Sequence, residues 1–576
     1  MIYLDVTKKV YSILNKKEKK ISFLLLLFTL IAIFLETLGL ATFFPLISAV
    51  LDENYFANPM YQKISNFLGI ESIDINIFIV FFVSLFIIKN LYLVFFTYWQ
   101  NYFTNNVSLR ICNDLYSAYL KKNYAFHAKS NSAFLIRNIN ESASIDAILL
   151  RILVLINEFI LVTGILILLF FVNFLATIII FSICIISLYI FNLFTKSKIK
   201  AYGEKKFSIF GSYMKNLYEG IHAFKEILLF NKKEYFINNN LKYRKRLLDY
   251  QLIFNLFSYL PRALIEVICI ISVLLLIYVL SMGQNTIQQI IPVLAVFSAS
   301  AFRLFPSALK IFSSLQSFSY IKPVIDNVES EIRNMKTETD YIEIKDKIEG
   351  DHTIFFEKEI DFKNINFHYI KDKPLLTNAN LKIIKGKSVG IIGKSGTGKS
   401  TFLNIFTGLL SPITGKILVD GVNINNNKIL WREKIGYVSQ DIFLLDSSIG
   451  ENIAFGVAKE KIDYLRIAKC IELVELEAYV DELIDGVNTM VGEKGIKISG
   501  GQRQRLGIAR ALYNAPDILI LDEATNSLDK NTENKILDTL KNLKNDFTIV
   551  MISHHENPLK IVDEVYELKF NTLIKK

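Results

Sequence analysis

Six long apolar stretches within the first 320 residues constrain the fold of this chain more than any other feature. They cover approximately residues 21–50, 75–103, 145–172, 174–194, 252–280 and 287–320. A membrane-spanning helix needs roughly 20 predominantly apolar residues, and each stretch reaches that length. One such run could be the buried core helix of a soluble protein, but six in one chain disfavour that interpretation. The sequence therefore predicts an α-helical membrane domain of six long transmembrane helices over residues 1–322.

Basic residues predict how these spans are oriented. Six lysines precede the first span, and the long connections after the second and fourth spans are also basic, whereas the connection after the first span is acidic. An excess of Lys and Arg marks the cytoplasmic side of a membrane protein. Both ends of the chain and both long connections are thus expected in the cytoplasm. This placement accounts for the net charge of +10 without nucleic acid as a partner.

The remaining residues differ in pattern from the spans. Residues 323–352 are rich in Glu, Lys, Asp and Thr and are expected to form a linker. Residues 353–576 alternate strand-like and helix-like patterns, which predicts an α/β domain. Residues 61–68, in the first outer connection, have apolar residues at helical spacing. They could form a helix on the outer membrane surface or a helix packed on the spans.

A phosphate-binding loop begins directly after the apolar strand pattern at residues 389–392. Its residues are Gly393, Lys394, Ser395, Gly396, Thr397, Gly398, Lys399, Ser400 and Thr401, and a helical pattern follows. In this strand–loop–helix setting the glycines let backbone N–H groups surround phosphates. Lys399 is expected to reach the β- and γ-phosphates, and Ser400 is expected to bind Mg²⁺. The cofactors predicted are therefore ATP and Mg²⁺.

A second apolar run, residues 518–521, ends in two acidic residues, Asp522 and Glu523. An acidic residue at such a strand end can hold the magnesium shell, and a second one can polarise the attacking water. We expect Asp522 in the first role and Glu523 in the second. A nucleotide-binding switch without turnover is the alternative, but a chain of that kind usually lacks the water-positioning carboxylate.

The motif Ser499-Gly500-Gly501-Gln502 lies upstream of that strand, and with it the sequence resembles the ATP-binding cassette family. The resemblance extends over the whole chain, as six spans followed by one α/β P-loop ATP-binding cassette domain. It implies that Tyr369 stacks on adenine, that Gln440 contacts Mg²⁺ and the attacking water, and that His554 contacts the γ-phosphate. It also implies a dimer-contact loop at residues 526–529 and a loop facing the membrane domain at residues 492–495.

The resemblance further implies that the chain is a half-transporter. In this family, ATP lies between the phosphate-binding loop of one domain and the Ser499–Gln502 motif of another. Because every motif is present, a homodimer with two equivalent sites is expected. Three positions depart from the usual pattern, namely Ile498, Asn526 and His555, and none of them removes a catalytic group.

Ionisable residues within the spans suggest what is transported. Arg303 and Lys310 are seven residues apart, so they share one helix face, and their own helix offers no acidic partner. Arg262 and Glu266 are four residues apart and could pair with each other. Charges inside a membrane are costly and usually face a cavity or a partner. A positively charged cavity would favour an anionic substrate.

The spans also resemble those of the PglK-type flippases, which turn over lipid-linked oligosaccharides in bacterial N-glycosylation. The residues concerned are 34–40, 44–47, 261–266 and 302–310, together with the outer segment 61–68. This resemblance implies a bacterial inner membrane and a pyrophosphate-linked lipid substrate held by Arg262, Arg303 and Lys310. Export of a peptide or of a lipid A precursor remains open as an alternative, as does an ATP-gated channel.

Overall fold

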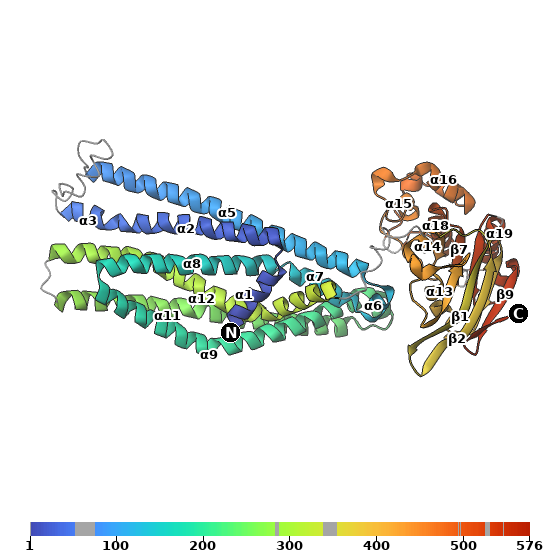
Figure 1. The fold of residues 1–576 in the computed structure, drawn as a ribbon, viewed down its shortest axis with the longest axis horizontal. Helices are drawn as coiled ribbons and strands as arrows, with labels where there is room; N and C mark the ends of the chain where they lie inside the picture. The colour runs from blue at the N-terminus through green and yellow to red at the C-terminus, as the bar shows by residue number, and fades with distance from the viewer. Residues whose placement is uncertain are drawn as a thin grey trace. The chain divides into compact units, whose positions relative to one another are not determined.

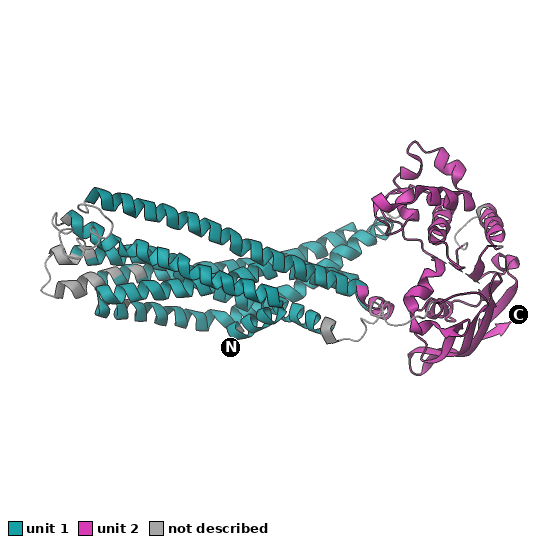
Figure 2. Ribbon diagram, turned by 45° about the horizontal axis from the view of Figure 1, so that its top comes forward, with its two compact units in different colours: residues 1–120, 130–338 teal, residues 121–129, 339–576 magenta. Residues whose placement is uncertain are grey.

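The computed structural model describes residues 2–51, 75–282, 287–337, 354–492, 495, 497–524, 530–544 and 546–576. The chain divides into two compact units, which Figure 2 colours separately. Unit 1 contains residues 1–120 and 130–338, and unit 2 contains residues 121–129 and 339–576. The expected outer segment 61–68 and residues 338–353 lie outside the described residues.

Unit 1 is helical throughout its described part (Figure 1). Its helices are α1 (Ile2–Ile13), α2 (Lys16–Ala41), α3 (Phe43–Leu51), α5 (Ile75–Lys121), α7 (Ser132–Ser142), α8 (Ile145–Val172), α9 (Phe174–His222), α10 (Phe224–Leu229), α11 (Lys233–Met282) and α12 (Ile287–Thr337). The six predicted spans are confirmed as helical segments that are long and apolar enough to cross a membrane.

Four of these helices continue well past the predicted apolar stretches. The helices α5, α9, α11 and α12 have 47, 49, 50 and 51 residues. The predicted linker is therefore helical in its first part, because α12 extends to Thr337. Charged side chains support this extension. Lys322 pairs with Asp326 one turn later at 2.9 Å, and Lys9 of α1 reaches Asp326 at 2.6 Å.

The first span is interrupted at Thr42, between α2 and α3. Pro45 explains the break, because a proline ring clashes with the carbonyl four residues earlier and cannot donate a backbone hydrogen bond. At the break, the Thr42 hydroxyl donates a hydrogen bond to the Gly39 carbonyl at 2.7 Å.

Unit 2 contains two sheets and the helices around them. Its strands are β1 (Glu359–Ile370), β2 (Lys373–Ile384), β3 (Ser388–Ile392), β4 (Thr414–Val419), β5 (Val422–Asn423), β6 (Ile435–Val438), β7 (Ile518–Asp522), β8 (Thr548–Ser553), β9 (Glu564–Lys569) and β10 (Thr572–Lys575). Its α-helices are α6 (Tyr124–Lys129), α13 (Lys399–Phe406), α14 (Lys428–Glu433), α15 (Ile449–Ile453), α16 (Tyr464–Leu473), α17 (Glu477–Asp481), α18 (Gly500–Tyr513) and α19 (Lys530–Leu543).

The larger sheet has the order β10-β9-β3-β8-β7-β6, and its strands from β9 to β6 are parallel. The smaller sheet, β2-β1-β4-β5, is antiparallel. Parallel strands that are buried on both faces appear in the sequence as continuous apolar runs. Strand β7 fits this rule, since residues 518–521 are fully buried.

Aromatic side chains fill the core between the phosphate-binding loop helix and the smaller sheet. Phe362 lies 5.2 Å from Phe402 and 5.3 Å from Phe406, measured between ring centroids. Trp431 is fully buried beside them and donates its indole N–H to the Phe406 carbonyl at 2.7 Å. This packing holds α13 rigidly at the end of β3.

The segment 121–129 was expected in the membrane domain, but it belongs with unit 2. Ala125 of α6 packs against the same aromatic core, which accounts for this assignment. The helix α6 is thus part of the unit that carries the sequence motifs.

One carboxylate, Asp563, joins the start of β3 to the segment before β9. Its Oδ2 accepts hydrogen bonds from the Ser388 backbone N–H and hydroxyl, each at 2.8 Å. Lys544 donates to its Oδ1 at 2.5 Å. Burial acts to raise the pKa of Asp563, but the bonds from Lys544 and Ser388 outweigh it and lower the pKa to about 2.

Asp563→Ala is expected to lower the free energy of unfolding of unit 2 by about 2 kcal/mol at pH 7, because hydrogen bonds to a charged group are lost. The folded-state pKa lies below the unfolded value of 3.8, so this stabilisation is present above pH 4 and is lost as the pH falls towards 2. Urea unfolding, followed by Trp431 fluorescence in a Trp99→Phe background, measures the difference. A difference that does not shrink between pH 7 and pH 3 would contradict the assignment.

Candidate functional site

The predicted motifs converge because they follow neighbouring parallel strands. The phosphate-binding loop follows β3, Glu523 follows β7, His554 follows β8 and Gln440 comes shortly after β6. The register aligns these ends, with Ile392 opposite Ser553 and Asp522 opposite Ile552. Ligand sites of open parallel sheets lie at the carboxyl ends of the strands.

The phosphate-binding loop needs its glycines for two different reasons. Gly396 and Gly398 have φ angles of 80° and 101°, a left-handed region that glycine adopts without strain. Gly393 needs space instead, because a Cβ there would lie 2.9 Å from the Thr397 hydroxyl and 3.0 Å from the Leu568 carbonyl. The loop leads into the N-terminus of α13, where unpaired N–H groups favour an anion.

Lys399 is buried and its ammonium lies within this loop. Its Nζ donates to the Gly393 carbonyl at 2.8 Å and to the Lys394 carbonyl at 3.2 Å. It also lies 3.8 Å from Glu523. Burial lowers the pKa of Lys399, and the nearby carboxylates Glu523 and Asp522 oppose that shift.

Glu523 stands at the centre of the site and has a φ angle of +50°. This strained conformation turns its side chain away from the strand direction. Its carboxylate accepts a hydrogen bond from the Gln440 amide at 2.8 Å and lies 2.6 Å from His554 Nε2. The three residues expected to be catalytic, Glu523, Gln440 and His554, are therefore in direct contact.

Asp522 precedes Glu523 and is bound by Tyr437 of β6, whose hydroxyl donates to its Oδ2 at 3.0 Å. Burial raises the pKa of Asp522, and the Tyr437 hydrogen bond acts in the opposite direction. Tyr437 was not among the site residues predicted from the sequence motifs. It comes three residues before Gln440, but only the pairing of β6 with β7 brings it to Asp522.

The side chains around Asp522 fit a magnesium ion. Mg²⁺ prefers oxygen ligands and usually combines one or two protein groups with phosphates and water. Gln440 uses its amide N–H on Glu523, so its amide oxygen is the group left to act as a ligand. The Ser400 hydroxyl and the Asp522 carboxylate are further oxygen groups of the kind that Mg²⁺ prefers.

Two predicted groups do not join this cluster. Tyr369 is on β1, in the other sheet, with its side chain largely exposed. Ser499 caps α18, where it and Gln502 bond to each other in a capping box. Gly500 and Gly501 are the first residues of α18, so the motif presents a helix N-terminus at the surface of the described chain. Residues 526–529, 493 and 494 lie outside the described residues.

Arg303 and Lys310 were expected to be cations without an acidic partner, but the structure shows each of them in an ion pair. Arg303 is ion-paired with Glu36 of α2, and its Nη2 donates to Glu36 Oε2 at 2.7 Å. Lys310 pairs with Glu158 of α8 at 2.6 Å. Both acids come from other helices, so spacing along α12 could not reveal them.

For Arg262, the sequence left open a pair with Glu266 and a role towards the substrate. The Arg262 guanidinium is exposed and lies 5.9 Å from the centroid of the Tyr259 ring. Glu266 is also exposed. Lys89 of α5 is a further charge that the predicted site omitted, and it lines the same cavity as Arg303 and Glu36.

Comparisons with known proteins find one matching family for each of the two units. The family described as ABC transporter transmembrane region matches residues 22–303, and the family described as ABC transporter matches residues 376–526. A bacterial Atm1-family ABC exporter solved with ATP bound has a similar fold. Its TM-score is 0.76 at 20% identity, over 97% of this chain and 95% of that one.

Several curated proteins align with part of the chain. An ABC transporter B family member 21 of Arabidopsis thaliana is 32% identical over 308 residues, which are 53% of this chain and 22% of that protein. An ATP-dependent lipid A-core flippase of Idiomarina loihiensis is 39% identical over 220 residues, 38% of each chain. A leukotoxin translocation ATP-binding protein of Mannheimia glucosida is 40% identical over 222 residues, 38% of this chain and 31% of that protein.

The aligned segments span between about a fifth and two-fifths of the length of these relatives. The two family matches, by contrast, cover the membrane unit and the motif-bearing unit in the expected order. The described part of the chain holds six helices able to span a membrane, followed by one nucleotide-binding unit. This chain belongs to the ABC transporters and has the half-transporter arrangement and the fold of an ABC exporter.

Proposed function

We propose that the chain is one half of an ATP-driven exporter that moves an anionic, lipid-linked substrate outward across a bacterial inner membrane. A lipid-linked oligosaccharide is the substrate that we propose first. The observation that supports ATP-driven turnover is the cluster of Glu523, Gln440, His554 and Lys399 at the ends of the parallel strands.

Each residue of this cluster has a distinct proposed role. The loop of residues 393–398 and the start of α13 bind phosphates through backbone N–H groups, and Lys399 neutralises their charge. Glu523 orients and polarises the attacking water, while Gln440 and His554 hold the Glu523 carboxylate in place. Magnesium, when bound, supplies Lewis-acid stabilisation of the phosphate charge next to Ser400, Asp522 and Gln440.

A second copy of the chain is proposed to complete each site. The exposed N-terminus of α18 at Ser499 is a ready anion site, because helix N-terminal N–H groups attract phosphates. A partner's Ser499 motif would therefore cover the ATP held by Lys399.

Two cavities in unit 1 support a lipid-linked anion as the substrate. One has a volume of about 490 Å³ and combines Glu36, Lys89 and Arg303 with apolar side chains such as Phe43 and Phe86. Two cations and one carboxylate leave it a net charge of +1, even though Arg303 is paired. Such a site offers both charge and apolar contact to an amphipathic anion.

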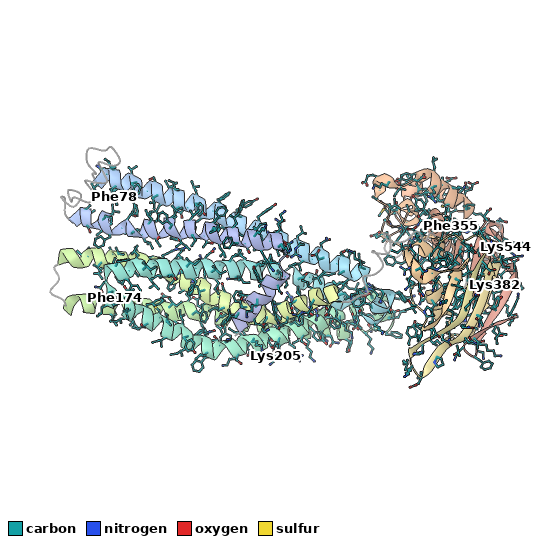
Figure 3. The ribbon with its side chains drawn as sticks, viewed as in Figure 1. Phe78, Phe174, Lys205, Phe355, Lys382 and Lys544 are labelled. Carbon is teal, nitrogen blue, oxygen red and sulfur yellow. The ribbon has the colours of Figure 1, made fainter. Side chains whose placement is uncertain are left out.

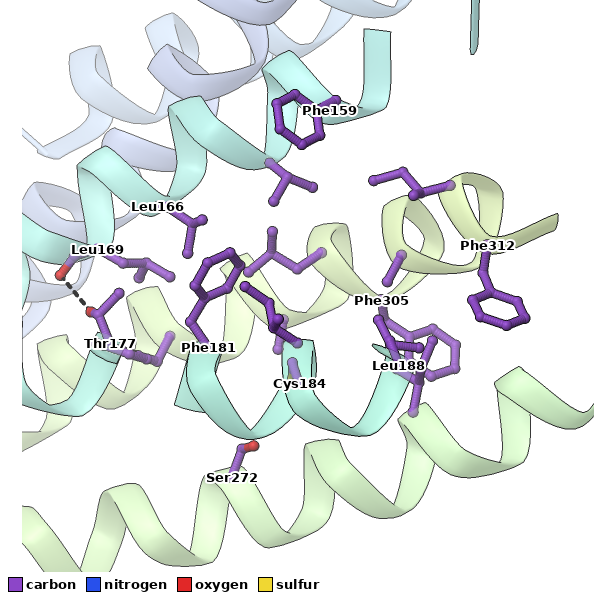
Figure 4. A pocket seen from close by; sticks show the side chains of 18 of the residues that line it. Phe159, Leu166, Leu169, Thr177, Phe181, Cys184, Leu188, Ser272, Phe305 and Phe312 are labelled. Atoms are coloured by element: carbon purple, nitrogen blue, oxygen red, sulfur yellow. Dashed lines mark hydrogen bonds between the residues drawn. The ribbon is translucent and has the colours of Figure 1, made fainter. Parts of the chain in front are cut away.

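The other cavity is almost wholly apolar. It has a volume of about 410 Å³ and is lined by side chains of α8, α9, α11 and α12, including Leu166, Phe181 and Phe305 (Figure 4). Ser272 is one of its few polar residues. A cavity with this apolar lining suits a hydrocarbon chain better than a hydrophilic peptide. A lipid A precursor is the second candidate, because it is also anionic and acylated and a lipid A-core flippase is among the relatives.

Transport in proteoliposomes tests the proposed function. Polyprenyl-pyrophosphate glycans, a lipid A precursor and peptides are compared for stimulation of ATP hydrolysis and for movement between leaflets. Stimulation by the glycan lipid alone supports the first proposal, and stimulation by the lipid A precursor alone supports the second. Stimulation by peptides only would contradict both, and an absence of ATP hydrolysis would contradict the exporter itself.

Glu523→Gln is expected to reduce ATP hydrolysis on the order of a thousandfold, because the polarising carboxylate is lost. ATP binding should remain intact, since affinity depends on the phosphate-binding loop and Tyr369. Single-turnover hydrolysis and equilibrium ATP binding measure the two effects. The matched control is Glu472→Gln, because Glu472 is exposed on α16. Hydrolysis within a few-fold of wild type would remove Glu523 from this role.

Mixing Lys399→Ala chains with Ser499→Ala chains is expected to restore hydrolysis that neither variant shows alone. In a mixed dimer, one site holds both substitutions and the other site holds neither. An equal mixture should recover about a quarter of the wild-type rate, since half of the dimers are mixed and each has one intact site. Co-purification with two different tags isolates the mixed dimer. Full hydrolysis by a monomer, independent of concentration, would refute the shared site.

The charged cavity makes a separate prediction about the substrate. Lys89→Gln, and the paired change Arg303→Gln with Glu36→Gln, are expected to weaken transport of a pyrophosphate-linked lipid about tenfold, the effect of 1–2 kcal/mol of lost attraction. The paired change avoids leaving the buried Glu36 unpaired. Lys310→Gln with Glu158→Gln probes the second ion pair in the same way.

Basal ATP hydrolysis should be unchanged in these variants, because the substitutions are in unit 1 and the nucleotide residues are in unit 2. Lys205→Gln serves as the control, since this lysine is exposed on α9 (Figure 3). Wild-type transport rates in all of the cavity variants would show that these charges are structural, and would leave the ATP-driven exporter proposal intact.

A further inference from the structure

Tyr437 connects the metal-binding carboxylate to a neighbouring strand. It pairs with Ile520 in the register of β6 and β7, which makes Asp522 its diagonal neighbour on the same face of the sheet. The Tyr437 hydroxyl uses this position to donate to Asp522 Oδ2 at 3.0 Å. A hydroxyl in this arrangement restricts rotation of the carboxylate.

We propose that Tyr437 is a positioning residue that orients the Asp522 carboxylate for the magnesium ion. The inference rests on the proposed function, because it takes Asp522 as a magnesium ligand. Groups that hydrogen-bond to a metal ligand orient it and tune its affinity. Because Tyr437 occupies Oδ2, it leaves Oδ1 of Asp522 for the metal shell.

The test uses Tyr437→Phe, which keeps the ring and removes only the hydroxyl. Tyr566→Phe on β9 is a matched control, because the Tyr566 hydroxyl also donates to a carboxylate, that of Glu564, at 3.0 Å. The full-length protein in detergent is titrated with Mn²⁺ in the presence of a non-hydrolysable ATP analogue. The electron paramagnetic resonance signal of free Mn²⁺ reports the metal affinity directly.

Tyr437→Phe is expected to weaken Mn²⁺ binding about tenfold, as other groups bonded to metal ligands do when they are removed. Binding of the analogue in EDTA and the unfolding midpoint should stay at wild-type values, which a merely structural role would not predict. Tyr566→Phe should leave the Mn²⁺ affinity unchanged. A Mn²⁺ affinity of Tyr437→Phe within twofold of wild type overturns the positioning role.

The wild-type chain separates failure of the proposed function from failure of this inference. If the wild-type chain binds no Mn²⁺ with the nucleotide, the proposed function itself fails, whereas normal wild-type binding with an unaffected Tyr437→Phe variant rejects only this inference.

Discussion

The parallel register of β3, β8, β7 and β6 is the constraint on which the nucleotide site depends. Backbone hydrogen bonds fix these four strands side by side, so that every residue immediately beyond their carboxyl ends is brought to one edge. Four segments far apart in the sequence then contribute Lys399, Gln440, Glu523 and His554 to one cluster. The strand core is fully buried and gives these side chains a rigid base.

Charge pairing is the corresponding constraint in the membrane unit. Glu36 and Glu158 are 4% and 6% exposed, and each is held by a cation of α12. Breaking a buried pair by removing one partner typically costs 3–5 kcal/mol, because the remaining charge has no counterion. These pairs therefore join α12 to α2 and to α8 as well as shaping the cavity.

Much of this architecture could be predicted from the sequence, because the relevant signals are local. The six spans follow from apolar length, and the phosphate-binding loop from glycines placed between a strand and a helix. Asp522, Glu523 and His554 could be proposed as site residues because each directly follows or ends an apolar strand. The structure brings Gln440 and His554 into contact with Glu523, and the roles expected of these residues stay predictions.

The features that escaped prediction depend on contacts between distant segments. The partners of Arg303 and Lys310 are 267 and 152 residues away, and no spacing rule reaches that far. The bond from Tyr437 to Asp522 required knowledge of which strands are neighbours. The assignment of residues 121–129 to unit 2 depended on packing by Ala125, a residue without any distinctive chemical signal.

The lengths of the membrane helices have a mechanical consequence. At 1.5 Å per residue, the 51 residues of α12 extend over about 76 Å, whereas the hydrocarbon core of a bilayer is about 30 Å thick. A helix of this length, if it crosses the bilayer, therefore extends more than half of its length beyond the hydrocarbon core. When such a long helix tilts, its distant end moves furthest. A tilt of about 5° displaces a point that lies about 45 Å from the pivot by about 4 Å. Rearrangements too small to disturb the packing of side chains within the bilayer would thus become large displacements at the far end of the same helix.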